Sequence, residues 1–90
     1  MSIYAVFLPM KDEEKSAQYR PQHLEFLEKL HESGSVSAYG KFADGSGGLV
    51  MYRAASYEET EKLVKEDPFV KEGARTYEIR EWVMTSSEWK

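Results

Sequence analysis

The chain contains no cysteine among its 90 residues, so a disulfide framework, a thiolate nucleophile and a thiolate metal site are excluded. It also has no excess of basic residues, because 12 lysines and arginines against 16 aspartates and glutamates give a formal net charge of −4. A nucleic-acid groove needs a basic face, so we expect no nucleic-acid partner. No apolar run approaches the roughly 18 residues of a membrane span, and the first residues do not resemble a signal peptide. We therefore expect a cytoplasmic protein that does not contact a membrane.

The residues that are present indicate a small folded domain. Hydrophobic residues make up 41% and charged residues 31% of the chain, which is typical of a globular protein. A length of 90 residues fits one domain, and we treat residues 1–90 as a single domain. A core of this size is small, so surface buried between two copies would add stability.

The longest amphipathic segment begins at Pro21, which suits the first turn of a helix, and ends before Gly34, which suits the C-terminal cap. At about 100° per residue, His23 falls on the same side of this helix as Phe26 and Leu27. A buried imidazole must find a hydrogen-bond partner or line a cavity, because an unpaired buried polar group costs about 1–3 kcal/mol. A core histidine bonded to a backbone carbonyl and a functional histidine both satisfy this requirement.

A second helix is predicted by the capping box Ser56-Tyr57-Glu58-Glu59. Its buried side is expected to carry four residues: Tyr57, Thr60, Leu63 and Val64. Asp67 falls on that same side, although Pro68 disfavours helical backbone there. Asp67 therefore either caps a short turn that ends at Gly73, or presents its carboxylate to a site.

Four segments read as strands. Ile3 to Leu8 is apolar on both faces, which is typical of a central strand that is covered twice. Val36 to Phe42 and Leu49 to Ala54 are joined by a glycine-rich turn, and Thr76 to Met84 alternates as the last strand. The polar residues 10–19 are predicted to form a loop before the first helix.

The order of these elements predicts an α+β fold, a ferredoxin-like βαββαβ domain with an antiparallel four-stranded sheet and two helices on one face. Right-handed crossovers place the first and third strands side by side, and we expect that pair to run parallel. Half of a set of apolar strand residues would be exposed on the face without helices, a larger patch than a monomer usually tolerates. The set comprises Tyr4, Val6, Leu8, Val50, Tyr52, Trp82 and Met84. A homodimer formed through the two sheets would cover that patch.

Three short motifs, in order and spacing, resemble those of the YciI-like, or YCII-related, proteins. They are Arg20-Pro21-x-His23-Leu24, Tyr39-Gly40, and Asp67-Pro68-Phe69-Val70 followed by Gly73. The resemblance implies a homodimer of the dimeric α+β barrel group and a His–Asp pair, which maps here onto His23 and Asp67 as catalytic residues. It further implies that Arg20, Tyr39 and Gly40 bind a small-molecule substrate, without a cofactor.

The activity implied by this resemblance is that of a small-molecule enzyme, an isomerase or a lyase. One relative removes chloride from a chlorinated aromatic acid metabolite, and the wider group includes muconolactone isomerases. A histidine suits proton transfer because it titrates near neutral pH, and a carboxylate can fix its tautomer. The alternative is a non-catalytic module that binds a small ligand or another protein. An open histidine with an acidic partner favours the enzyme, and a sealed histidine bonded to backbone favours the alternative.

Two geometric points bear on these candidates. His23 and His31 point about 80° apart on the helix, so we expect no metal site. His23 is near the start of the first helix and Asp67 near the end of the second, so parallel helices packed in register would separate them by about 15 Å. Contact requires an axial offset, a chain that turns back at Pro68, or the other subunit, and the sequence leaves all three open.

Overall fold

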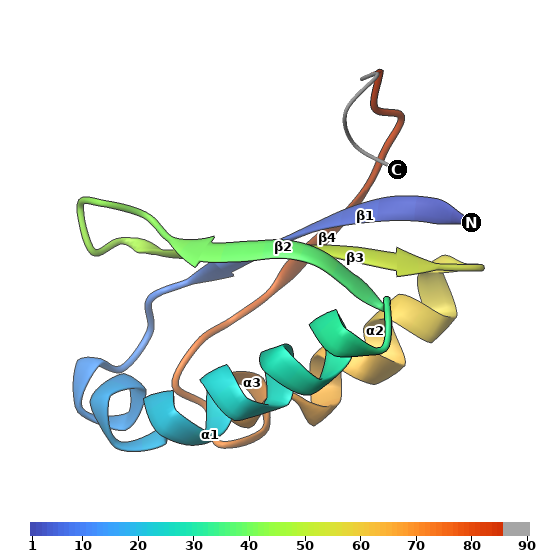
Figure 1. The fold of residues 1–90 in the computed structure, drawn as a ribbon. Coiled ribbons are helices and arrows are strands. Elements are labelled where there is room, and N and C mark those ends of the chain that lie inside the picture. The colour runs from blue at the N-terminus through green and yellow to red at the C-terminus, as the bar shows by residue number, and fades with distance from the viewer. Residues whose placement is uncertain (86–90) are drawn as a thin grey trace.

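The structure is a computed structural model that describes residues 1–85, and it contains two layers, a sheet and the helices on one side of it (Figure 1). The elements are β1 (Ser2–Pro9), α1 (Glu13–Glu32), β2 (Val36–Lys41), β3 (Gly47–Ala54), α2 (Tyr57–Glu66), α3 (Pro68–Lys71) and β4 (Glu78–Trp82). The strand order is β2-β3-β1-β4. This arrangement confirms the predicted ferredoxin-like α+β fold.

The expected parallel pairing of the first and third strands was wrong. β1 runs antiparallel to β3 and also to β4, and β2 runs antiparallel to β3. The crossover through α1 makes β1 and β2 the two strands that share a direction. β3 then returns from β2 through the hairpin, lies between these two strands and opposes both.

The β2–β3 hairpin forms as predicted, and β3 begins two residues earlier than expected. The Phe42 amide donates to the Gly47 carbonyl at 2.9 Å. Gly47 has a φ of +149°, and a Cβ built there would lie 2.4 Å from the Leu8 carbonyl oxygen. Glycine is therefore required at this position, because only a residue without a side chain lets β3 approach the end of β1 so closely.

The first helix begins at Glu13, eight residues before the predicted start, so the segment predicted to be a loop is mostly helical. The Asp12 side chain caps it by accepting from the Lys15 amide at 3.0 Å. Pro21 lies inside the helix rather than in its first turn. The periodicity failed here because Ser16 is the one buried residue in the first two turns, and a serine gives no apolar signal.

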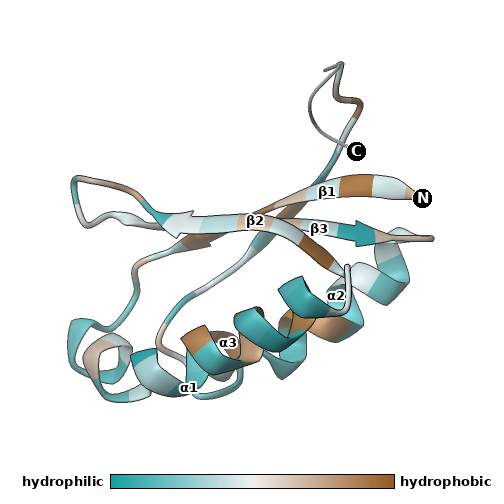
Figure 2. Cartoon of the chain, in the orientation of Figure 1, coloured by the Kyte–Doolittle hydropathy of each residue, from teal (hydrophilic) through white to brown (hydrophobic). Residues whose placement is uncertain are grey.

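The core lies between the sheet and the helices. Its buried residues are Tyr4, Val6, Leu8, Leu27, Val36, Val50, Tyr52, Ala54 and Val64. Figure 2 shows that most of α1 and of α2 is hydrophilic, as expected for helices that bury one side. On α2 the buried side runs through Thr60 and Val64, whereas Tyr57 is 43% exposed, contrary to the prediction.

The face of the sheet without helices carries a different apolar set from the one expected. Val6 pairs with Val50 and Tyr4 with Tyr52, and all four are buried on the helix side. The other face presents Ile3, Ala5, Phe7, Leu49, Met51 and Trp82, which are opposite one another in the pairs Ile3–Trp82, Ala5–Met51 and Phe7–Leu49. Half of the predicted set was expected on that face, whereas within the strands only its member Trp82 lies there.

The helix start can be tested at its cap. Asp12→Ala should lower the free energy of unfolding by about 1 kcal/mol, because the Lys15 amide loses its acceptor. Asp12→Asn should lie within a few tenths of a kcal/mol of the parent, since an amide oxygen also caps a helix. Urea denaturation measures both values. Equal stability of Asp12→Ala and the parent would mean that the helix does not begin at Glu13.

Candidate functional site

His23 and Asp67 are in direct contact within one chain. The Nδ1 atom of His23 lies 2.8 Å from Oδ1 and 3.0 Å from Oδ2 of Asp67. A carboxylate can only accept, so Nδ1–H donates. The two residues are 8% and 1% exposed. Because α1 starts at Glu13, His23 lies about 12 Å further along the helix than the predicted start would place it, which supplies the axial offset.

Asp67 fills both of the roles that its sequence position left open. Besides contacting His23, its Oδ1 atom accepts from the Phe69 amide at 2.9 Å and so caps α3. The helix ends at Lys71, its C-cap is Glu72, and Gly73 follows with a φ of +78°. The cap fixes the carboxylate at the start of α3, and the short helix places the Phe69 ring close to His23.

Phe69 connects the histidine to a buried arginine. The rings of His23 and Phe69 stack with centroids 3.8 Å apart and planes 12° apart. The Cζ atom of Arg75 lies 4.4 Å from the Phe69 centroid. Both contacts are favourable for an aromatic ring, the second because a cation is attracted to its π face. One buried phenyl ring therefore limits the positions of the imidazole and the guanidinium.

The turn that follows α3 brings Arg75 back over Phe69. The amides of Ala74 and Arg75 both donate to the Phe69 carbonyl, at 2.9 and 3.0 Å. The Ala74 carbonyl then accepts from the amides of Lys11 and Asp12, at 3.2 and 3.0 Å. These bonds hold the turn against the start of α1.

The second ring nitrogen of His23 remains accessible. Nε2 makes no hydrogen bond within residues 1–85. In that range the only buried side-chain polar atom without a partner is the hydroxyl oxygen of Ser37. Nε2 therefore keeps contact with solvent, and in the neutral ring it carries the lone pair because Nδ1 holds the proton.

A YCII-related domain matches residues 2–83 of this sequence. The chain belongs to the YCII-related family. The uncharacterized protein YjpA of Bacillus subtilis (strain 168) is 31% identical over 77 residues, which cover 86% of this chain and 91% of YjpA. Among solved structures, 5-chloro-2-hydroxyhydroquinone dehydrochlorinase of Burkholderia phenoliruptrix AC1100, in complex with 2,5-dihydroxybenzoquinone, superimposes with a TM-score of 0.76 at 20% identity. That match covers 89% of this chain and 92% of the other, and it shows a shared fold.

The other predicted site residues of this YCII-related protein lie in two places. Arg20 is exposed on α1, one turn before His23, and its charge acts on Arg75. Tyr39 and Gly40 are exposed on β2, where they line a shallow hollow of about 250 Å³. The Tyr39 ring meets His31 edge to face at 6.2 Å. The structure thus places the charge of Arg20 near Arg75, and the Tyr39 ring against the other histidine.

Three residues of this cluster were not anticipated in their roles: Ser16, Phe69 and Arg75. Phe69 belongs to a noted motif, but nothing local indicated stacking on a residue of another helix. Ser16 accepts from the Nε atom of Arg75 at 3.1 Å, across a sequence separation of 59 residues. Asp12 was the one local indication of this contact, because an aspartate can cap a helix. A helix that starts after Asp12 places Ser16 beside the turn that follows α3.

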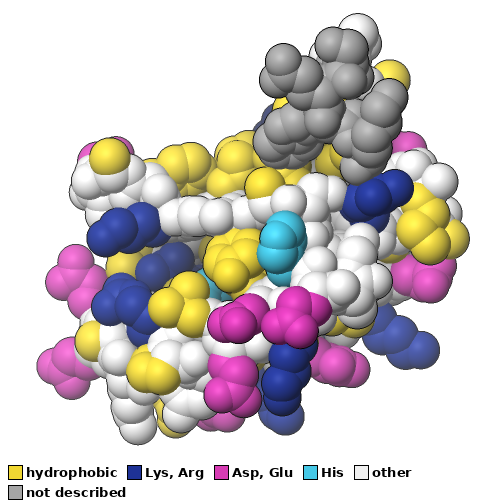
Figure 3. Space-filling model, in the orientation of Figure 1, with side chains coloured by type: hydrophobic (Ala, Val, Ile, Leu, Met, Phe, Trp, Pro, Cys, Tyr) yellow, Lys and Arg dark blue, Asp and Glu magenta, His cyan; other side chains and the backbone are white. Residues whose placement is uncertain are grey.

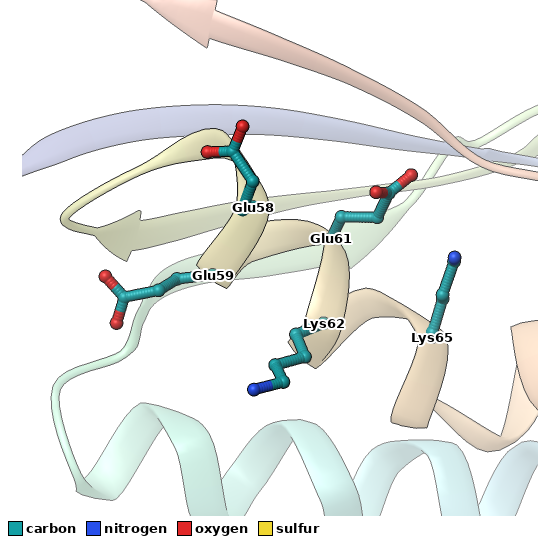
Figure 4. A pocket seen from close by; sticks show the side chains of 5 residues that line it. All are labelled: Glu58, Glu59, Glu61, Lys62 and Lys65. Atoms are coloured by element: carbon teal, nitrogen blue, oxygen red, sulfur yellow. The ribbon is translucent and has the colours of Figure 1, made fainter.

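A second hollow, of about 280 Å³, lies on the surface of α2 and has a different character. Figure 4 shows its five side chains diverging, with Glu59 and Lys62 toward the side of α1, and Glu58, Glu61 and Lys65 away from it. Within residues 1–85 no three acidic or histidine side chains are grouped to hold a metal ion, and no helix could span a membrane. The cluster around His23 is therefore the candidate site.

Tyr52, at the centre of β3, allows a test of this buried environment. Burial, and then the nearby charge of Asp67, raise the pKa of Tyr52 above its ordinary value of 10.0. The folded chain then holds this proton at pH values where the unfolded chain loses it. The stabilisation is complete below about pH 10, and the free energy of unfolding falls above that pH, by up to about 1.4 kcal/mol per pH unit.

Tyr52→Phe should therefore flatten the alkaline decline of stability. Urea denaturation between pH 9 and about pH 11 measures the slope in both proteins. Tyr57→Phe, at a tyrosine that is 43% exposed, is the matched control. The same alkaline slope in Tyr52→Phe and the parent would contradict a raised pKa.

Proposed function

We propose that this YCII-related protein is a small-molecule enzyme, an isomerase or a lyase, in which His23 transfers a proton and Asp67 positions it. The observation that carries the proposal is the difference in bonding between the two ring nitrogens of His23. Nδ1 is bonded to a carboxylate that is 1% exposed, while Nε2 has no partner within residues 1–85. A core histidine has no need of a buried carboxylate, because a backbone carbonyl would satisfy it.

The proposed step begins when the Nε2 lone pair of His23 takes a proton from an acidic C–H or O–H group of the substrate. The electron pair left behind forms a new double bond. In a lyase it expels a leaving group, such as chloride, from the adjacent carbon. In an isomerase the same Nε2–H returns the proton to a different carbon. Asp67 keeps Nδ1 protonated throughout and stabilises the imidazolium by its charge.

The surroundings of the pair suit this role. Asp67 is held by the Phe69 amide as well as by His23, so the carboxylate is fixed before a substrate arrives. Stacking on Phe69 restrains rotation of the imidazole. A group positioned in advance does not have to be ordered during the reaction, which lowers the barrier.

The structural neighbour supports the lyase form of the proposal. Its name identifies it as a dehydrochlorinase, and it was solved with a quinone bound. Loss of hydrogen chloride from a ring needs a base at one carbon and departure of chloride at the next, which is the step described for His23. At 20% identity this support concerns the type of reaction and leaves the substrate open.

Substitution of the histidine separates enzyme from binding module. His23→Asn should stay folded, because the amide can still donate to Asp67, and should lose turnover of any substrate found by screening small acids, lactones and chlorinated hydroquinones. His31→Asn is the matched control and should keep activity, since His31 bonds the Val36 carbonyl outside the cluster. Full activity in His23→Asn would contradict the proposal that His23 is the general base.

Asp67→Asn should lower kcat by about 10²-fold or more while preserving the cap of α3. The amide can still accept from the Phe69 amide but no longer carries the charge that stabilises the imidazolium. Circular dichroism and single-turnover kinetics measure the two effects separately. If Asp67 were only a cap, kcat would not change.

We also propose that the protein is a homodimer formed through the face of the sheet that lacks helices. That face carries the half-buried Phe7 and Leu49 and the 43% exposed Trp82, beside Met51, which is buried within the chain. The hollow beside Tyr39 and Gly40 also opens against Leu49 and Met51, so a partner sheet would cover one wall of it. Apolar surface of this kind is stabilised by burial against a second copy.

The two faces predict different outcomes for one added charge. Leu49→Asp should yield a folded monomer, because Leu49 lies on the open face, whereas Val50→Asp should unfold the chain, because Val50 is in the core. Sedimentation at micromolar concentration and circular dichroism measure mass and folding. A mass near the chain's own 10.4 kDa for the parent protein would rule the dimer out.

A further inference from the structure

Arg75 is a buried cation without an acidic partner in the described part of the chain. It is 7% exposed. The ion pairs within residues 1–85 are His23–Asp67, Lys29–Glu25 and Arg80–Glu78. Buried charges are usually paired, because removing a charge from water is costly. An unpaired buried guanidinium therefore points to a negative group that is supplied from outside.

Most of the hydrogen-bonding capacity of this guanidinium is unused. Its Nε atom donates to Ser16 at 3.1 Å and its Nη1 atom to the Leu8 carbonyl at 3.3 Å. A guanidinium has five N–H donors in a planar fork, so three remain without a partner in residues 1–85. Nη2 has no partner in that range and is not among the buried unpartnered atoms there, so Nη2 reaches solvent. The bonds to Ser16 and Leu8 fix the orientation of the guanidinium, and its Nη2 group remains free to bind another acceptor.

The electrostatic surroundings are positive, although the chain as a whole is negative. Burial, followed by the charge of Arg20, lowers the pKa of Arg75, and Asp67 opposes this effect. Asp67 itself is already bonded to His23 and Phe69. Figure 3 shows Lys and Arg side chains around a hollow between the β2–β3 hairpin and the first half of α1. An anion entering there would relieve the repulsion between the two arginines.

The sheet packs directly against one side of the guanidinium. A Cβ built on Gly48 would lie 3.8 Å from Nη1 of Arg75 and 3.0 Å from the Gly40 carbonyl oxygen. Because Gly48 has no side chain, backbone alone borders the guanidinium on this side. Gly40, which the family resemblance placed at the substrate, lies next to Gly48 and so close to Arg75.

We propose that Arg75 binds an anionic oxygen of the substrate on which His23 acts, with Arg20 adding to the attraction. The substrate class is then a small organic anion, a carboxylate or a ring oxide, whose acidic hydrogen lies within about one ring of the charged oxygen. Arg75 and His23 both contact Phe69, so they are no further apart than their two contact distances combined. This inference rests on the proposed role of His23, but the binding step needs no turnover.

The test uses benzoate as the probe, benzamide as its neutral match and 4-nitrophenolate as the ring-oxide form. NMR spectra of the ¹⁵N-labelled parent protein should show the Arg75 Nε–Hε signal shifting with benzoate and not with benzamide. Arg75→Gln should weaken benzoate binding by about tenfold or more and remove the preference over benzamide. Lys29→Gln is the control for net charge, since Lys29 pairs with Glu25 on the exposed side of α1, and it should bind like the parent.

Failure of both benzoate and 4-nitrophenolate to bind more tightly than benzamide, or an Arg75 signal that neither anion moves, would overturn the anion site. Unweakened binding of both anions by folded Arg75→Gln would overturn it as well. Should Arg75→Gln fail to fold, the spectra of the parent protein decide the matter alone. A response to one anion and not the other assigns the oxygen as carboxylate or ring oxide. None of these results depends on the activity of His23→Asn, so the two proposals can fail separately.

Discussion

The structure around the site depends on one buried carboxylate. Asp67 is 1% exposed, and a charge removed from water this completely must be compensated by its neighbours. His23 and the Phe69 amide form hydrogen bonds with the Asp67 carboxylate, and Arg75 interacts with it electrostatically. His23 belongs to α1, Phe69 to α3, and Arg75 to the segment that follows α3. The position of α3 against α1 can therefore be understood as the arrangement that compensates Asp67.

Local chemistry made much of this predictable. The capping box at Ser56, the glycine-rich hairpin and the alternation of the last strand each depend on neighbours in the sequence, and each element was found. The cap at Asp67 is also local, because Pro68 and Gly73 delimit α3 from either side. The strand order followed from general rules of chain connection once the elements were known.

What could not be predicted depends on distant partners. The first half of α1 buries a serine, and Ser16 makes sense only beside Ala74 and Arg75, whose positions are set by α3. For a strand that is apolar on both sides, periodicity cannot say which side meets the helices, so the residues of the open face could not be identified from the sequence. Whether His23 and Asp67 touch could not be decided from the sequence either, since it depended on where α1 begins.

The contacts of the site join residues that are far apart in the sequence, and this determines when the site forms during folding. The residues of the His–Asp contact are 44 positions apart, and the Ser16–Arg75 bond spans 59. Neither can form in a locally ordered fragment, so the site exists only when both ends of the chain have come together. A ligand that binds there recognises the completed fold and stabilises it by mass action. Occupancy of this site is thus a direct report on how much of the protein in a sample is fully folded.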